Sequence, residues 1–270
     1  MRPSSRMARN RAPEKVSFNS AARWRVRRAS QRMVIPKGMG APPVGGGPYG
    51  KLELAGPKAY RRSSTSNVYP SPHLSPHLSI HEIVTRASSG DLPAWAVAGD
   101  SRRAHMGRVS TLLGAWAYQL ELSKEDRVRW EAVGFLHDAL RDAAPEALRR
   151  RLPPTLADLP DTIIHGPAAA EQLRIDGVKD GELLRAISGH TVGDPDFGLM
   201  GRALYCADFL EPGRSFLTEW RENQRARMPS ELNAVALEIA GARIGNVVER
   251  EGTILPRTVA FWNRLVEDAP

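Results

Sequence analysis

The sequence beyond Ile80 predicts an all-α fold. Apolar residues in this part recur at intervals of three and four over long segments, which is the periodicity of amphipathic helices. No stretch of useful length alternates between apolar and polar residues, as a half-buried β-strand would. The chain has 270 residues, of which 41% are hydrophobic, so it can bury the core of one sizeable domain.

The first 79 residues have a different composition. They are rich in Arg, Ser, Pro and Gly, include GAPPVGGGPYG and SPHLSPHLS, and show no sustained period. Such a segment buries too little apolar surface to offset the entropy of ordering it, so we predict a disordered tail over 1–79. Residues 1–80 hold 15 Lys or Arg and two acids, a charge of +13, which leaves −5 for the rest of a chain with net charge +8. The sequence therefore predicts a basic tail followed by a mildly acidic domain over 80–270.

Several interpretations of the tail stay open. An Arg- and Ser-rich segment with few acids also resembles an organelle transit peptide or an over-extended start of translation. The cluster RWRVRRASQR can attract nucleic acid or anionic surfaces without sequence specificity, although a solvated tail is the favoured interpretation. His73, His77 and His81 recur at intervals of four, but Pro72 and Pro76 interrupt a helix there, so we predict no metal site.

Two long helices open the folded part. The first is expected over 102–120, where one stripe carries His105, Val109, Leu112, Leu113, Trp116 and Leu120. The second begins after Ser123, a suitable N-cap with Asp126 three residues later, and is expected to run to Asp142. One face of this second helix carries Trp130, Val133 and His137.

Further helices follow a proline-marked loop at Pro153, Pro154 and Pro160. The word HGPAAAEQL predicts a helix that begins near Pro167, and another is expected over 181–190 with His190 at its end. The segment GLMGRALYCADFL places Met200, Leu204 and Asp208 at four-residue spacing. Amphipathic segments over 231–249 and 256–266 complete the domain.

Histidines and aspartates gather in this helical part. Asp138 follows His137 directly in GFLHDALRD, beside apolar residues. An ionised carboxylate buried next to an imidazole costs several kcal/mol unless a partner compensates it, and a divalent cation is an effective partner. Six nitrogen and oxygen ligands of this kind suit iron, manganese and other first-row divalent metals. The six are His105, His137, Asp138, His165, His190 and Asp208.

The order H … HD … H … H … D resembles the ligand pattern of the HD-domain metal-dependent phosphohydrolases in their dinuclear form. The words HGPAAAEQL, SGHTVGDPD and ALYCADFLEPGR are similar to segments of the bacterial HD-domain hydrolases that cleave diadenosine tetraphosphate symmetrically. The resemblance spans roughly 103–263. It implies an HD-domain helical bundle in which His105, His137, Asp138 and Asp208 hold one metal, while His165 and His190 complete a second.

The resemblance also implies a chemistry. Two cations activate a water molecule and polarise the phosphoryl oxygens of a nucleotide substrate, and by resemblance both are expected to be iron, with manganese or another divalent metal as the alternative. We expect Asp138, Arg141 and Arg214 to be the catalytic side chains, the arginines by binding phosphate. Arg141 stands where the family usually has lysine, which leaves substrate identity less secure than hydrolysis. An ion pair with Glu211 is an equally good interpretation of Arg214.

Other functions stay open at this stage. The shared ligands also fit a nucleoside monophosphatase, an alarmone hydrolase, or a non-catalytic nucleotide-sensing module with a nucleic-acid-binding tail. They do not indicate an oligomeric state. No run approaches the roughly 18 apolar residues that a membrane span needs, so we expect no span and a cytoplasmic protein. The single cysteine, Cys206, lies in the apolar run ALYCAD and is expected to be a buried packing residue.

Overall fold

The computed structural model describes residues 80–269, and within this range every regular element is a helix. The all-α prediction is confirmed for these residues. The predicted tail, with its arginine cluster, His73 and His77, lies outside the described residues, and the domain boundary near Ile80 stays a prediction. The elements are α1 (Glu82–Ser88), α2 (Asp100–Gln119), α3 (Lys124–Leu136), α4 (Pro145–Arg149), the 3-10 turn η1 (Pro154–Leu156), α5 (His165–Ile175), α6 (Gly181–Gly189), α7 (Leu199–Leu210), α8 (Thr218–Arg227), α9 (Leu232–Glu249) and α10 (Pro256–Glu267).

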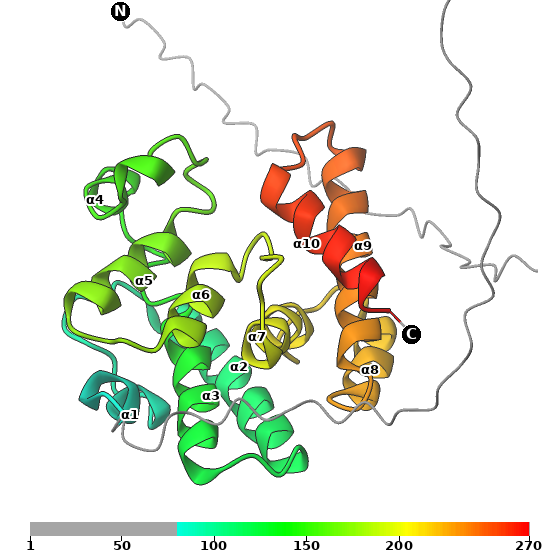
Figure 1. Cartoon of the computed structure of the whole chain (residues 1–270), viewed down its shortest axis with the longest axis horizontal. Coiled ribbons are helices and arrows are strands. Elements are labelled where there is room, and N and C mark those ends of the chain that lie inside the picture. Colours follow the sequence, from blue (N-terminus) through cyan, green and yellow to red (C-terminus); the bar gives the residue numbers. More distant parts are fainter. Residues whose placement is uncertain (1–79, 270) are drawn as a thin grey trace, which may run out of the picture. The chain divides into compact units, whose positions relative to one another are not determined.

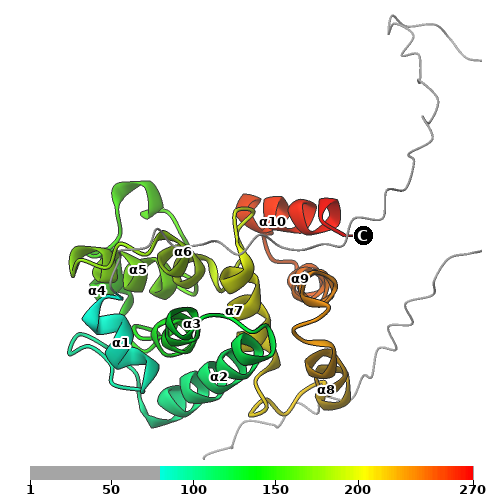
Figure 2. The same cartoon turned by 60° about the horizontal axis from the view of Figure 1, so that its bottom comes forward.

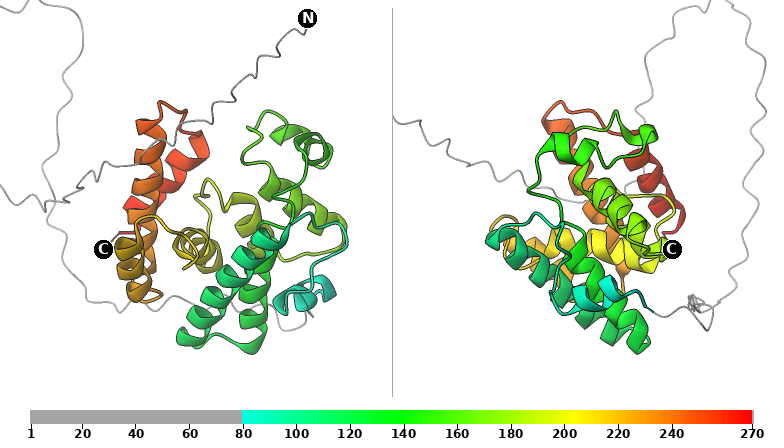
Figure 3. Two further views of the ribbon diagram at one scale, coloured as in Figure 1. Left: turned by 180° about the vertical axis from the view of Figure 1, so that it is seen from behind. Right: turned by 90° about the vertical axis from the view of Figure 1, so that its left-hand side faces the viewer.

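Helix α7 lies at the centre of the bundle (Figure 1). It packs against α2, α3 and α6 on one side and against α8 and α9 on the other. Figure 2 shows this division clearly, with α10 packed across α9, and the rear and side views of Figure 3 agree with it. The sequence of α7 explains its position, because Met200, Leu204, Tyr205 and Leu210 are all buried. A helix that is apolar nearly all round belongs in the interior.

Helices α2 and α3 form a closely packed pair joined by the short turn 120–123. A Cβ added to Gly134 on α3 would lie 2.5 Å from the Ser110 Cα on α2, so only glycine permits this approach. The start of α3 is as the sequence predicts, since the Ser123 hydroxyl accepts a hydrogen bond from the Asp126 amide at 3.0 Å. This pair therefore holds His105 and His137, one on each helix, at a fixed separation.

The end of α3 corrects the sequence prediction. The helix ends at Leu136 rather than at Asp142, and a series of tight turns follows. His137 Nδ1 lies 2.8 Å from the Gly134 carbonyl oxygen, which is the acceptor that the Asp138 amide would use if the helix continued. The backbone then turns through bonds of the i to i−3 type, including Ala139 N to Leu136 O. The HD pair thus lies at a helix end and not within a helix.

The remaining boundaries show what periodicity can detect. Helices α2, α6, α9 and α10 lie within two residues of their predicted limits, whereas α5 begins at His165 rather than near Pro167. Helices α1, α4 and α8 are short or polar and have no apolar pattern that predicts them. Cys206 is fully buried, as expected, and burial raises the pKa of its thiol. Among the described helices, none combines the length and the apolar character that a membrane crossing requires.

Candidate metal centre

The six side chains predicted as metal ligands converge on one place inside the bundle. They come from five helices or their ends: His105 from α2, His137 and Asp138 from the end of α3, His165 from the start of α5, His190 from the end of α6, and Asp208 from α7. The four histidines and Asp138 are at most 5% exposed. The condition on which the sequence interpretation depends, one shared location for all six, is therefore met.

Asp138 lies between two pairs of imidazoles. Its Oδ1 is 3.1 Å from His165 Nε2 and 3.4 Å from His190 Nε2. Its Oδ2 faces the other pair, at 3.7 Å from His105 Nε2 and 3.6 Å from His137 Nε2. Each oxygen of this carboxylate thus faces a different pair of imidazole nitrogens.

Asp208 extends the first pair. Its Oδ1 lies 3.3 Å from His105 Nε2. Two groups of three side chains, which share His137, have their possible ligand atoms within 4.8 Å of one another. One group is His105, His137 and Asp208, and the other is His137, Asp138 and His190. Three or more nitrogen and oxygen ligands at such spacing match the donor set of first-row divalent metals.

Two of the histidines are oriented by the helices that they terminate. His137 Nδ1 contacts the Gly134 carbonyl and His190 Nδ1 contacts the Ile187 carbonyl, each at 2.8 Å and each three residues back. Because these carbonyls accept a hydrogen bond from Nδ1–H, they favour the neutral tautomer in which Nε2 carries the lone pair, and they point Nε2 toward Asp138. A metal-ligating histidine is normally fixed by such a contact at its other nitrogen.

Burial and charge set the protonation of the centre. Burial lowers the pKa of His137 to about 4, against the opposing attraction of Asp138. Burial also lowers the pKa of His165. Burial would raise the pKa of Asp138 and of Asp208, but the imidazoles around Asp138, and His105 and Arg243 around Asp208, hold both values well below the usual range. Burial opposes the protonation of His190, but the hydrogen bond and the charge of Asp138 raise its pKa. The centre thus combines ionised carboxylates with two imidazoles, His137 and His165, whose lowered pKa favours the neutral form that binds cations.

The side chains present fit a divalent cation. His137 Nε2 is buried and makes no hydrogen bond within the described part of the chain, and neither does His105 Nε2. A buried polar atom without a partner is costly, and a cation between these nitrogens and the carboxylates would satisfy both. We therefore take this cluster as the candidate site for a divalent metal, on the geometry of its own donors.

Three further residues contact the ligands and are not evident from the sequence motif. Arg102 Nη1 donates to Asp138 Oδ2 at 2.7 Å, and Arg243 Nη2 donates to Asp208 Oδ2 at 3.0 Å. Glu211, only 2% exposed, lies 3.3 Å from His105 Nδ1. Arg102 has a local signal, since it precedes His105 by three residues and so shares its helix face. The contact of Glu211 with His105 and that of Arg243 with Asp208 each join two helices that no sequence pattern connects.

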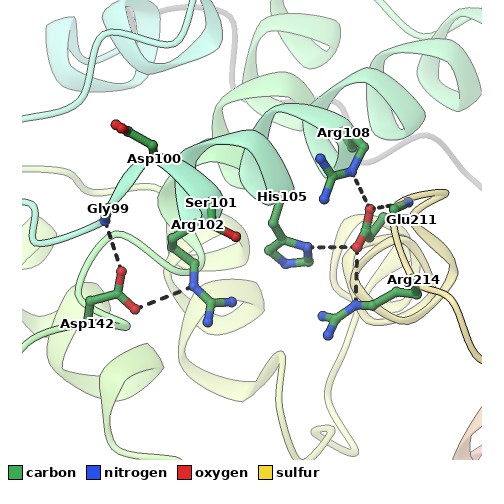
Figure 4. Close-up of a pocket in the computed structure, with 10 residues that line it drawn as sticks. Gly99, Asp100, Ser101, Arg102, His105, Arg108, Asp142, Glu211 and Arg214 are labelled. Carbon is green, nitrogen blue, oxygen red and sulfur yellow. Dashed lines mark hydrogen bonds and ion pairs between the residues drawn. The ribbon is translucent and has the colours of Figure 1, made fainter.

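The two arginines predicted to bind phosphate have different surroundings. Arg214 lines a pocket next to His105 and lies 3.2 Å from Glu211 Oε1 and 3.4 Å from Asp208 Oδ1 (Figure 4). It therefore has the ion pair with Glu211 and a place at the pocket as well. Arg141 lies near His165, whose pKa its charge helps to lower, but its side chain has no hydrogen bond or ion pair with a described residue. Its role in binding phosphate stays a prediction.

Two curated proteins resemble this chain in sequence, although no family model matches it. A curated relative from Halalkalibacterium halodurans, named bis(5'-nucleosyl)-tetraphosphatase, symmetrical, is 25% identical over 168 residues, which cover 59% of this chain and 89% of the relative. A relative of the same name from Bacillus subtilis is 26% identical over 147 residues, covering 52% and 78%.

A solved structure supports the fold. It comes from Clostridium acetobutylicum, is described as a predicted HD superfamily hydrolase involved in NAD metabolism, and matches with a TM-score of 0.57 at 23% identity. The match covers 69% of this chain and 96% of the other. The chain therefore shares the fold of this predicted HD superfamily hydrolase, and it is similar in sequence to curated relatives that are named symmetrical bis(5'-nucleosyl)-tetraphosphatases.

Proposed function

We propose that this chain hydrolyses dinucleoside tetraphosphates symmetrically, with diadenosine tetraphosphate as the representative substrate and two ADP as the products. The observation that carries the proposal is the position of Asp138, whose two oxygens face separate imidazole pairs. The curated relatives support the substrate class through their name. One water is consumed: its oxygen bonds to the attacked phosphorus, and the bridging oxygen leaves with the second ADP.

In this proposal, the six side chains would form two adjacent metal sites. His105, His137 and Asp208 hold one divalent ion, His165 and His190 hold the other, and Asp138 serves both. When bound, two such ions lower the pKa of water and offset charge on the phosphoryl oxygens. Iron is our proposal for both sites, with manganese as the alternative, because imidazole and carboxylate donors suit either metal.

The surrounding residues have supporting roles. The Gly134 and Ile187 carbonyls keep Nε2 of His137 and of His190 free to bind a metal, as their 2.8 Å contacts with Nδ1 indicate. Arg102 contacts Asp138 and lines the pocket, so its guanidinium lies between the carboxylate and an entering phosphate. Arg214 is in the same pocket and supplies a second cationic group. The cytoplasmic location expected from the sequence stays a prediction.

Product analysis tests this function directly. Metal-loaded protein is incubated with diadenosine tetraphosphate, and we expect two ADP, whereas asymmetrical cleavage would give AMP and ATP. A parallel panel contains a nucleoside monophosphate and an alarmone, which represent the other HD phosphohydrolases. Exclusive turnover of either would replace the proposed substrate.

Two histidine variants, one at the site and one control, test the metal centre. We expect His137→Ala to lose bound metal and hydrolysis together, because its Nε2 belongs to both ligand groups. His81→Asn is the control, since His81 lies at the N-terminus of α1, where its Nδ1 accepts from the Ile83 amide, and asparagine is also a good N-cap. Unchanged hydrolysis in His137→Ala would contradict the proposal, and a protein that binds nucleotide without any turnover would favour the sensing module.

A further inference from the structure

A pocket of about 430 Å³ opens beside the metal centre, and arginines from different directions line it. In Figure 4, the guanidinium groups of Arg102, Arg108 and Arg214 surround the space next to His105. This volume lies within the range of about 300–1,000 Å³ that is usual for small-molecule sites. His105 is one of the proposed metal ligands and Arg102 contacts Asp138, whereas Arg108 contacts none of the proposed ligands directly and pairs with Glu211.

Helix α2 sets the position of Arg108 relative to the metal centre. Arg102 and Arg108 each lie three residues from His105, one on either side, so each is its neighbour on the helix surface. The rise from His105 to Arg108 is roughly 4.5 Å along the helix axis. In a phosphoanhydride chain, neighbouring phosphorus atoms are joined through a single bridging oxygen. Arg108 is therefore placed to reach the phosphate next to one held at His105.

The Arg108 guanidinium is held in place by the loop that follows α7. Its Nε donates to Glu211 Oε2 at 2.5 Å, and the same oxygen accepts from the Gly213 amide at 2.7 Å. A Cβ added to Gly213 would lie 2.4 Å from Arg108 Nη2, so the guanidinium packs directly on the bare glycine. Glu211 is buried, and these contacts fix the plane of the guanidinium before any ligand arrives.

The outer edge of this guanidinium is available to an anion. The Arg108 side chain is 38% exposed, and its two Nη atoms make no hydrogen bond with a described residue. Arg108 and Arg214 both contact the carboxylate of Glu211, and Arg214 also lies 3.4 Å from Asp208 Oδ1, so Arg108 shares its carboxylate partner with a second cation. A fixed, planar pair of N–H donors is the geometry that recognises two phosphate oxygens at once.

We infer that Arg108, assisted by Arg214, binds the phosphate adjacent to the attacked one. The site then selects a polyphosphate chain over a phosphate monoester. This inference rests on the proposed function, because it assumes that a nucleotide phosphate is held at the metal centre. It goes further because it makes Arg108, a residue outside the ligand motif, a determinant of specificity. Arg108 would distinguish substrates with several phosphates from substrates with one.

Calorimetric titration of the metal-loaded full chain with ADP and with AMP tests the inference. We expect Arg108→Gln to weaken ADP binding about tenfold, as the loss of one charge-assisted contact predicts, and to change AMP binding less than twofold. Gly213→Ala is expected to have the same effect, because its methyl group displaces the Arg108 guanidinium without removing a charge. Arg103→Gln is the control, since Arg103 is exposed on the same helix and donates to the Ala98 carbonyl.

Metal content, measured for every variant, is expected to equal that of the wild type. Unchanged ADP affinity in both Arg108→Gln and Gly213→Ala overturns the inference, and so does an equal loss of ADP and AMP affinity. If the wild type meanwhile cleaves diadenosine tetraphosphate, only the role of Arg108 fails. If the wild type neither binds these nucleotides nor hydrolyses the dinucleotide, the proposed function fails as well.

Discussion

The two halves of the metal centre are built in different ways. The enclosed half consists of His165 and His190, which are at most 3% exposed. The pocket half contains His105 and Asp208, and His105 lines the cavity. A backbone carbonyl orients His190, whereas charged side chains contact the pocket half, Glu211 at His105 and Arg243 at Asp208.

This difference indicates which changes each half tolerates. Backbone carbonyls at helix ends cannot be altered by substitution, so the geometry of the enclosed half depends on how closely the helices pack. The pocket half depends on carboxylates and guanidinium groups that a single substitution can change. We therefore expect the enclosed half to respond to steric changes and the pocket half to electrostatic ones.

The largest effect should come from the residue that both halves share. We expect Asp138→Asn to lower hydrolysis of diadenosine tetraphosphate at least about a thousandfold, because the several kcal/mol that metal ions contribute to such reactions would be lost. Metal analysis should show both ions weakened. Asp91→Asn is the control, since Asp91 forms an exposed ion pair with Arg86. Full metal content in Asp138→Asn would show that the two halves do not depend on this carboxylate.

A methyl group should damage the enclosed half. In Gly166→Ala the new Cβ would lie 2.7 Å from the Ile187 carbonyl oxygen and 3.0 Å from the His190 ring. We expect the variant to lose about 1–3 kcal/mol of unfolding free energy through overpacking and to bind one metal less tightly than the other. Thermal unfolding and metal titration measure these two effects. Equal weakening of both metals would contradict the separation into halves.

An electrostatic change should affect the pocket half without unfolding the protein. Glu211→Gln removes the charge that faces His105 Nδ1, and such supporting contacts usually change metal affinity about 10–100-fold. We expect the metal ion of the pocket half, which this variant binds more weakly, to occupy its site fully when the metal concentration in solution is raised. Glu222→Gln, at an exposed position, should leave the affinity unchanged. If Glu211→Gln loses a metal that no concentration restores, the pocket half is as rigid as the enclosed one.

The smallest expected effect is a gain of stability away from both halves. Gly245 lies within α9, and a Cβ added there would meet no atom within 4 Å. We expect Gly245→Ala to raise the unfolding free energy by about 0.5–1 kcal/mol, because alanine loses less backbone entropy in a helix. Unfolding in denaturant measures this change, while metal affinity should stay that of the wild type. The variant is also the matched control for Gly166→Ala.

Helix α8 shows why part of the fold is not evident from the sequence. Its residues Thr218–Arg227 include few apolar side chains, and the side chains that it buries are Arg221 and Gln224. The Arg221 guanidinium stacks on Phe209 at 4.4 Å and on Phe216 at 3.9 Å. Rings from outside the helix thus supply the apolar surroundings. Periodicity detects helices that carry an apolar stripe of their own, and α8 carries no such stripe.

The sequence by itself determined the helical class, the N-cap at Ser123 and most helix limits, and it predicted the six side chains of the centre through a resemblance to a known family. The class, the cap and the limits depend on residue type and on short spacing along the chain, which a sequence contains directly. Tertiary structure alone decided that each oxygen of Asp138 faces a different imidazole pair and that Glu211 and Arg243 contact His105 and Asp208. It also decided that Arg108 lies on Gly213 at the pocket. The physical reason is that these contacts join helices distant in sequence, and their distances are set by how α2, α7 and α9 pack around one another.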